Sequence, residues 1–377
     1  MAPLNIAVIG TGVGGPAAAI GLARNGHSVT LYERASSIGG VGFAFRISPS
    51  SDQCLKFLGI DILAGGGVAA KWSRFMNYEG RLFAEIPENE TPEEARKGLS
   101  AYVYRFLDEA TKQGVQIKMG VEVASVDVVN STISFADAST SSFDLIIGAD
   151  GVYAIRNDPI TSHVIDDKFL LTGWKGIGKL VVGYVVDYGT QFNLVCTHPE
   201  ELSRRETSSG DDADKSSYNQ KISLDTAKNI YKEFDKVVVR LLELADPGGF
   251  RVWKLLDMDD LPHWSKNRVV LIGDACHPVL PFGFAGASMA IEDAVTLTVL
   301  FPSGIELAQI KDRLRLFEHI RRKRVYRVRD ESRKRSSGSK DAAGTTAYGQ
   351  FLNNHDAVGE AEQALKEQQE LEFAQVI

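Results

Sequence analysis

Residues 5–33 decide the fold, and they read NIAVIGTGVGGPAAAIGLARNGHSVTLYE. The β-branched run 5–9 is long enough for one strand that is buried on both faces of a parallel sheet. A glycine-rich turn follows it directly. The alanine-rich segment 16–24 predicts a helix that Gly26 would end, and 28–32 predicts a second strand. This strand–loop–helix–strand order is typical of dinucleotide-binding units.

The glycines of the turn have separate purposes in such a unit. Gly10 permits a tight turn, Gly12 lets the backbone approach a pyrophosphate, and Gly15 lets the helix pack closely on the strand. Gly14 lies between them at the start of the helix, where free N–H groups and the helix dipole favour an anion. Glu33 ends the second strand, where its carboxylate can accept both ribose hydroxyls of an adenosine. The unit predicts a bound dinucleotide but does not distinguish FAD from NAD.

A second motif follows far downstream, after a buried strand predicted at 268–272. It reads GDACHPVLPFGFAGA over residues 273–287, and a helix is expected from about Ser288. Asp274, just after the strand, can hold the hydroxyls of a ribityl chain. A loop of small residues at a helix start can point N–H groups at the flavin N1 and C2 carbonyl, where negative charge gathers on reduction. This motif favours FAD.

With this motif and the helical residues 291–294, IEDA, the chain resembles the group A FAD-dependent aromatic monooxygenases, of the salicylate hydroxylase and 6-hydroxynicotinate 3-monooxygenase kind. The resemblance covers most of residues 1–335 and includes the stretches 255–264 and 314–321. It implies an α/β fold with a Rossmann-type, glutathione-reductase-like FAD-binding domain, an inserted mixed β-sheet substrate domain and C-terminal helices. It also implies FAD as cofactor, with NADPH or NADH as a transient reductant.

The resemblance assigns further cofactor-binding positions. Asp274 would bind the ribityl chain, and Asp150, in the strand-ending motif 143–151, would lie at the pyrophosphate. Arg34 adjoins Glu33 in the same predicted site. The positions expected to back the isoalloxazine are Pro281, Gly283, Ala285, Gly286 and Ala287.

Four features depart from the family's pattern. Ala154 stands where the middle motif has a serine, and Arg156 comes one residue early, which puts the docking of NAD(P)H in question. Ser100 stands where the family has an arginine that contacts FAD, and Arg105 is the candidate substitute. The stretch 284–286 reads FAG where the family often has GQG. The chain after Arg156 is also shorter than expected, which indicates a shortened substrate domain.

Three separated pieces are expected to build the FAD-binding domain, residues 1–60, 98–156 and 265–335. Residues 61–97 and 157–264 would form the substrate domain that covers the isoalloxazine, and 336–377 a C-terminal helical tail. The elements expected within the substrate domain are strands at 180–186 and 192–196 and a helix at 224–244.

By the resemblance, the chain is an FAD-dependent monooxygenase. NAD(P)H would reduce the flavin, oxygen would add at C4a, and the C4a-hydroperoxyflavin would transfer one oxygen atom to a small aromatic, phenolic substrate. Arg46 is the candidate partner of a substrate carboxylate, and Tyr184 the candidate to bind or deprotonate a phenol. The alternatives are a surface salt bridge for Arg46 and a core position for Tyr184.

Two other functions stay open on the sequence alone. One is a flavoprotein with non-oxygenating chemistry, such as an oxidase, a dehydrogenase or a redox-neutral rearrangement. The other is a catalytically decayed protein that still binds FAD. The altered middle motif and the shortened substrate domain motivate both alternatives.

The charged residues near the second motif have plain structural interpretations. The stretch 311–335 is strongly basic, and its apolar residues trace one helical face, so most of its arginines are expected on the solvent-exposed side of an amphipathic helix. Glu292 and Asp293 are interpreted as helix-start caps, His277 as a residue that braces its loop, and Cys276 as a small buried hydrophobe.

Composition sets the remaining limits. A net charge of −7 and 44% hydrophobic residues predict an ordinary globular protein with no nucleic-acid partner. Three cysteines without metal-ligand spacing favour a reducing compartment and predict no metal site. The apolar run 4–23 has no basic region before it and is interrupted by glycines, so a cytoplasmic protein is expected rather than a membrane one. The oligomeric state is not predicted.

Overall fold

The computed structural model describes residues 2–37, 44–62, 64, 67–69, 72–87, 99–102, 104–150, 179–186, 191–203, 220–245, 250–252, 255, 257–281, 285–336 and 343–376. Its central element is a six-stranded sheet in the order β17-β18-β12-β1-β2-β8. Every neighbouring pair is parallel except β17 with β18. The strands are β1 (Asn5–Ile9), β2 (Ser28–Glu33), β8 (Gln116–Met119), β12 (Leu145–Gly148), β17 (Ser265–Lys266) and β18 (Val269–Leu271).

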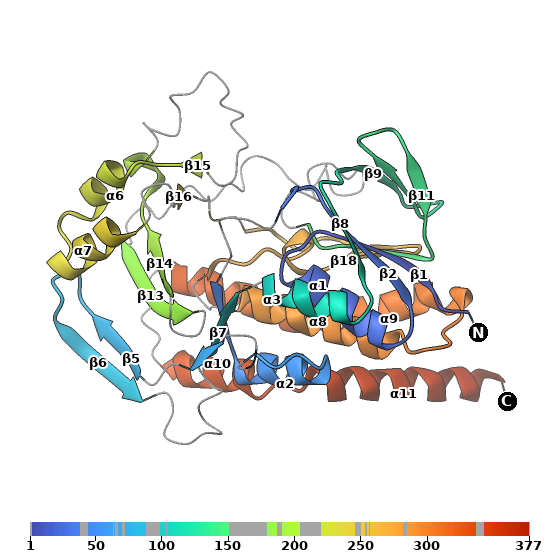
Figure 1. Ribbon diagram of the computed structural model, residues 1–377. Helices are drawn as coiled ribbons and strands as arrows, with labels where there is room; N and C mark the ends of the chain where they lie inside the picture. The colour runs from blue at the N-terminus through green and yellow to red at the C-terminus, as the bar shows by residue number, and fades with distance from the viewer. Residues whose placement is uncertain are drawn as a thin grey trace.

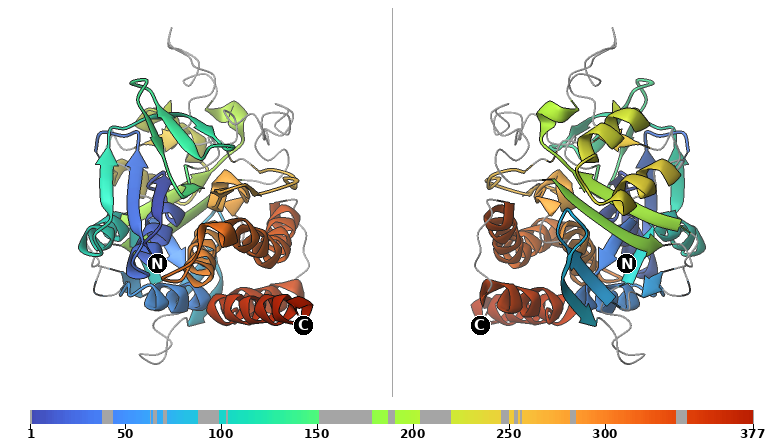
Figure 2. Two further views of the ribbon diagram at one scale, coloured as in Figure 1. Left: turned by 90° about the vertical axis from the view of Figure 1, so that its right-hand side faces the viewer. Right: turned by 90° about the vertical axis from the view of Figure 1, so that its left-hand side faces the viewer.

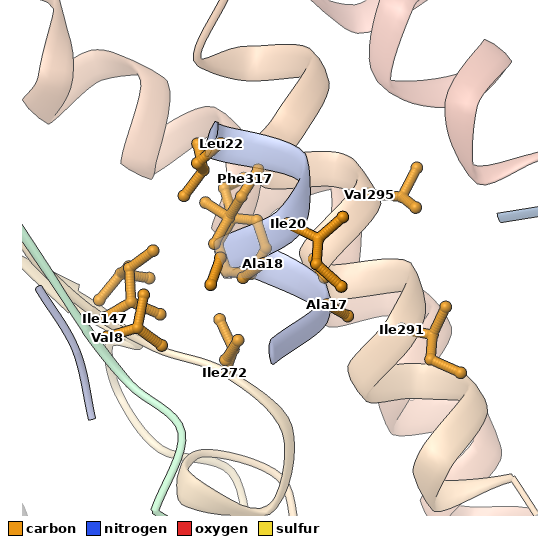
Figure 3. Close-up of a cluster of buried hydrophobic side chains, with 14 of the residues drawn as sticks. Val8, Ala17, Ala18, Ile20, Leu22, Ile147, Ile272, Ile291, Val295 and Phe317 are labelled. Atoms are coloured by element: carbon orange, nitrogen blue, oxygen red, sulfur yellow. The ribbon is translucent and has the colours of Figure 1, made fainter. Parts of the chain in front are cut away.

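Both faces of this sheet are covered, which explains why its central strands are continuous apolar runs. Helices α1 (Gly14–Arg24) and α8 (Gly286–Leu300) lie on one face. Figure 3 shows side chains of Val8, Ile147 and Ile272 from the sheet side of this core, together with those of α1 and α8. On the other face, the antiparallel strands β9 (Val123–Asp127), β10 (Thr132–Phe135) and β11 (Thr140–Ser142) form a second apolar layer.

The long helix α9 (Ile310–Ser336) and the C-terminal helices lie beyond α8 (Figures 1 and 2). Helices α10 (Ala343–Asn353) and α11 (Ala357–Val376) lie beside α2 (Pro49–Phe57), at the bottom of Figure 1. Ala357 and Ala361 of α11 are buried in the main core, so the tail is part of the folded body. Helix α3 (Tyr104–Lys112) packs beside α1.

A second region lies at the left of Figure 1 and is built from small sheets. All of its described strand pairs are antiparallel. The three-stranded sheet has the order β3-β7-β4, and three two-stranded sheets accompany it. The strands are β3 (Ala44–Ile47), β4 (Val68–Ala69), β5 (Trp72–Met76), β6 (Leu82–Pro87), β7 (Leu99–Tyr102), β13 (Leu180–Val186), β14 (Gln191–Thr197), β15 (Gln220–Lys221) and β16 (Arg251–Val252).

Helices α6 (Leu224–Tyr231) and α7 (Lys236–Leu244) cover one face of the β13–β14 hairpin. A single helix was expected over 224–244, and this expectation is wrong. A turn at 232–234 separates the two helices, and the carboxylate of Asp235 then accepts a hydrogen bond from the backbone N–H of Val237 and caps α7.

The expected fold class is confirmed. Strand β1 has the predicted bounds, and the predicted helix and second strand of the 5–33 unit are α1 and β2. The C-terminal tail is helical as expected. None of the described helices combines the length and apolar character that crossing a membrane would require.

Candidate functional site

Three loops that are far apart in sequence meet at one edge of the central sheet. Strands β1, β12 and β18 are adjacent and parallel, so the residues that follow them lie together at the carboxyl edge. These residues are Gly10, Asp150 and Asp274. The backbones of Gly10 and Asp150 are close, because a Cβ atom added at Gly10 would lie 2.6 Å from the carbonyl oxygen of Ala149 and from the Cα of Asp150. Ligands of open parallel sheets bind at this edge.

The glycine turn has the geometry that the sequence predicts. Gly10 has φ +102°, which other residues rarely adopt, and its neighbours leave no space for a side chain. A Cβ atom at Gly15 would lie 2.0 Å from the carbonyl oxygen of Gly10, so only glycine lets α1 begin this close to β1. Gly12 differs, because it is exposed and an added Cβ would come no nearer than 3.7 Å to another atom. Its backbone is therefore open to a ligand.

Glu33 and Arg34 lie at the end of β2, next to this turn. One carboxylate oxygen of Glu33 accepts hydrogen bonds from the N–H (3.1 Å) and the hydroxyl (2.6 Å) of Thr11. The other oxygen accepts from the N–H of Ala35 at 2.9 Å. Each carboxylate oxygen has more than one acceptor site, so these bonds fix Glu33 while leaving capacity for a ligand hydroxyl. The exposed Arg34 acts electrostatically on Asp150.

Asp150 and Asp274 are open to solvent, and yet surrounding protein desolvates both carboxylates. Burial raises the pKa of Asp150 to about 6, with Arg34 lowering it and Glu33 raising it. Burial likewise raises the pKa of Asp274, with a lowering contribution from His277. The charged form of each carboxylate is therefore disfavoured at the edge where a ligand would lie.

The start of α8 lies near the same edge, since Gly14 and Gly273 are both close to Ala290 of α8. Ala285 is buried, Gly286 and Ala287 are half-buried, and Pro281 is exposed. The described part of α8 has no side-chain cap on its first N–H groups and no acidic residue in its first turn. Free N–H groups at a helix start favour an anionic or electron-rich partner. Gly283, which was also expected here, lies outside the described residues.

These residues fit an FAD molecule. The open backbone at Gly12 suits a diphosphate, and Asp274 accepts no hydrogen bond from any described residue, which leaves its carboxylate to the ribityl hydroxyls. Gly14 is buried, and a Cβ there would lie 3.3 Å from the Cβ of Ala290, so α1 starts against α8. The two motifs thus border one continuous site.

The three remaining candidates are described only by their backbones. Arg46 is in β3, paired in register with Ser100 of β7. Arg105 is in the first turn of α3, and Tyr184 is opposite Asn193 in the β13–β14 hairpin. Their side chains lie outside the described residues, as do residues 154 and 156 of the altered middle motif. Their roles stay predictions.

The basic helix α9 contains buried ion pairs that the sequence interpretation missed. Most of its arginines were expected on the solvent-exposed side, and this expectation fails for four that are buried, Arg313, Arg321, Arg324 and Arg329. Arg321 lies 2.8 Å from carboxylate oxygens of both Glu292 and Asp293. The interpretation of these two acids as helix-start caps is also wrong, since both lie in the second turn of α8 and are fully buried.

A signal for these pairs exists in the sequence. Glu292 and Asp293 are the only charged residues of α8, whose other residues are apolar or carry small hydroxyl groups, and charges in such a helix need buried partners. Arg321 and Arg324 are three positions apart, so they share one face of α9. His277 braces its loop as expected, because its Nε2–H donates to Asp293 at 2.7 Å. Cys276 is buried, and burial raises the pKa of its thiol.

Comparisons with known proteins agree with an FAD-binding fold. A model of the NAD(P)-binding Rossmann-like domain matches residues 8–78, and a model of the FAD binding domain matches residues 184–332. A solved substrate complex of salicylate hydroxylase has the same fold, with a TM-score of 0.68 and 21% identity over 96% of this chain and 98% of that one.

Two curated relatives cover most of the chain. Hispidin-3-hydroxylase of Neonothopanus nambi is 26% identical over 87% of this chain and 87% of its own length. 3-Hydroxybenzoate 6-hydroxylase 1 of Aquipseudomonas alcaligenes is 28% identical over 87% and 88%. The first match runs over 382 aligned positions, more than the 377 residues of this chain, so that relative has segments that this chain lacks. The predicted relationship to FAD-dependent aromatic hydroxylases is confirmed.

Proposed function

We propose that this chain, an FAD-dependent monooxygenase of the salicylate hydroxylase kind, oxidises NADH or NADPH and inserts one atom of molecular oxygen into a small aromatic substrate with a phenolic hydroxyl. The observation that carries the proposal is the carboxyl edge of the central sheet, where the glycine turn and the desolvated carboxylates of Asp150 and Asp274 lie together. The substrate class is supported by two relatives whose names describe hydroxylation of hispidin and of 3-hydroxybenzoate.

Each part of the edge has a separate binding role in this proposal. The backbone from Gly10 to Gly15 and the start of α1 hold the diphosphate, because the first N–H groups of a helix have no partner within it, α1 has no side-chain cap, and the helix dipole favours an anion. Glu33, fixed by Thr11, accepts the adenosine ribose. Asp274 accepts the ribityl hydroxyls. Asp150 lies beside the diphosphate, with Arg34 reducing the local excess of negative charge.

The start of α8 would act on the electron-rich side of the flavin. The N–H groups of Gly286 and Ala287 are not used by a side-chain cap, so they can stabilise negative charge near the flavin N1 and C2 carbonyl. When bound, FAD supplies two-electron redox chemistry and the activation of oxygen, which amino-acid side chains do not provide.

Substrate binding is assigned to the second region. Arg46 in β3 is proposed to pair with a substrate carboxylate, and Tyr184 in β13 to hydrogen-bond or deprotonate the phenol. Helices α6 and α7 cover the hairpin face that carries Leu194 and Cys196. Position 184 is on the opposite pleat face, since residues alternate along a strand and its register partner is residue 193.

The direct test is anaerobic reduction of the purified, FAD-loaded protein. NADPH and then NADH are mixed with it, with and without candidate phenols, and the visible absorbance of the flavin is followed. We expect bleaching that a suitable phenol accelerates, followed in air by oxygen uptake and a hydroxylated product. Reduction by the substrate alone would replace this proposal with non-oxygenating chemistry. A flavin that nothing reduces would indicate a decayed enzyme.

The cofactor site is tested separately by substitution. Asp274→Ala removes the carboxylate proposed for the ribityl chain, and Asp312→Ala, an exposed acid of α9, is its control. We expect FAD affinity to fall about tenfold or more for the first variant, since a hydrogen bond to a charged group is lost, and not to change for the second. Equal affinity in both variants would contradict the assignment.

A further inference from the structure

We propose that Asp293 and His277 are positioning residues for the flavin, and that a buried chain of alternating charges extends this support to the C-terminal helices. The turn Gly273–Ala275 contains Asp274, and the side chain of Asp293 in α8 is hydrogen-bonded to this turn. The proposal rests on the ribityl role proposed above for Asp274.

Asp293 fixes the turn on both sides of Asp274. One carboxylate oxygen, Oδ2, accepts the backbone N–H of Gly273 at 2.9 Å and the Nε2–H of His277 at 2.7 Å. Gly273 has φ +58°, and a Cβ there would lie 3.2 Å from the Cβ of Ala290. The turn is therefore pressed against α8, and a shift of the Asp293 carboxylate would move both anchors together.

Asp293 is itself held in place by a guanidinium. Its second oxygen, Oδ1, accepts from the Nε–H of Arg321 at 2.8 Å, and both side chains are fully buried. Arg321 also lies 2.8 Å from Glu292 and donates to the backbone carbonyl of Met289 at 3.2 Å. Because both oxygens of Asp293 are bonded, its carboxylate has one orientation and presents Oδ2 to the turn.

The chain of charges continues to the C-terminal helices. Arg324 forms a bidentate pair with Glu292, at 2.6 and 2.7 Å. It also donates to the backbone carbonyls of Phe351 (2.9 Å) and Leu352 (3.3 Å) in the last turn of α10. The last carbonyls of a helix have no hydrogen-bond donor within the helix, and Arg324 supplies the donors for these two. The tail is thereby joined to the residues that hold the flavin turn.

A purely stabilising network would have the same contacts, so the test separates flavin geometry from stability. Asp293→Asn removes the charge that holds the turn. His277→Phe removes one anchor, keeps a ring against Trp264, whose ring centroid lies 5.0 Å away, and leaves Asp293 paired with Arg321. Arg329→Gln is the matched control, because Arg329 is buried in the same helix but pairs with Asp260.

Two readouts are measured on the FAD-loaded proteins: the FAD dissociation constant and the visible circular dichroism of the bound flavin. We expect Asp293→Asn and His277→Phe to raise the dissociation constant about tenfold or more and to change the circular dichroism. The FAD dissociation constant of the double variant should be no higher than that of the more strongly affected single variant, since both changes release the same turn. Arg329→Gln should lower the melting temperature while leaving both readouts unchanged.

The outcomes are decisive in both directions. If Asp293→Asn and His277→Phe lower the melting temperature but keep the wild-type affinity and circular dichroism, the positioning role is refuted. If Asp293→Asn does not fold, His277→Phe alone decides the question by the same two readouts. An unchanged affinity in Asp274→Ala would instead refute the ribityl assignment, so the two failures are distinguishable.

Discussion

Replacing Arg321 with methionine should lower the free energy of unfolding by about 3–5 kcal/mol, the usual cost of removing one partner from a buried ion pair. The guanidinium is fully buried and lies 2.8 Å from two carboxylates that belong to different residues, Glu292 and Asp293. Methionine fills a similar length but neutralises neither. Glu292 keeps Arg324 and Asp293 keeps His277, which limits the loss to this range rather than a larger one.

Arg315 in the same helix provides the matched control. Its side chain is 66% exposed and lies 3.1 Å from Asp312, three positions away. Exposed pairs at this spacing contribute about 0.2–0.5 kcal/mol. R315M therefore makes the same chemical change with a similar starting distance, at an exposed guanidinium that has one carboxylate partner instead of two. The difference between the two losses measures the combined effect of burial and of the second carboxylate.

The assay is urea unfolding of both variants and of the wild type, followed by far-UV circular dichroism at one FAD concentration. The FAD concentration must be the same because a bound ligand adds to apparent stability. Unchanged slopes with shifted midpoints would identify a change in stability alone. A loss below about 1 kcal/mol for R321M, or equal losses in the two variants, would refute the reasoning that this buried guanidinium neutralises the pair of acids.

Gly15→Ala should abolish retention of FAD on gel filtration, because the added Cβ would lie 2.0 Å from the carbonyl oxygen of Gly10. Gly349→Ala is the control and should retain FAD, because a Cβ there would meet open space. The pKa of Asp150 is raised to about 6, so this carboxylate becomes neutral near the diphosphate as the pH falls from about 8 to about 5.5, and FAD should bind more tightly. Fluorescence titration of FAD binding should show a weaker pH dependence in Asp150→Asn than in the wild type. Burial alone would raise the pKa of Asp293, but His277 and Arg321 lower it to about 2. The ionised carboxylate therefore contributes its full stabilisation above the ordinary pKa of an aspartate, and this contribution is lost as the pH falls towards 2. Asp293→Asn should flatten this acid limb of the stability profile, measured as the urea midpoint at each pH.

The local part of the fold could be predicted because its signals are local. The run from Asn5 to Glu33 specifies strand, turn, helix and strand through residues that are adjacent in sequence, and the structure follows it closely. Gly10 and Gly15 carry this information because no other residue fits their positions. The second motif at 273–287 was found for the same reason.

The partners of the buried charges could not be assigned in this way. Nothing in the local sequence distinguishes Arg321 from the other arginines of this basic helix. Its side chain is buried only because α8 packs against α9 and brings Asp293 and Glu292 to this face. Helical periodicity counts apolar residues, so it assigns arginines to solvent even where they are paired in the core. The break between α6 and α7 was missed similarly, because Asp235 caps a helix only once the preceding turn has formed.

The position of β1 between β2 and β12 has a consequence for how the protein is made. Residues 17–22 of α1 have almost no exposed surface in the folded protein, and α8 provides part of their cover. At a synthesis rate of roughly 5–20 residues per second, α8 leaves the ribosome on the order of 10–50 seconds after α1. Throughout that interval the nascent chain has a strand edge and a helix face without their final partners. Newly made chains should therefore depend on chaperones until synthesis is nearly finished, and messages that end before α8 should yield aggregates rather than a small nucleotide-binding fragment.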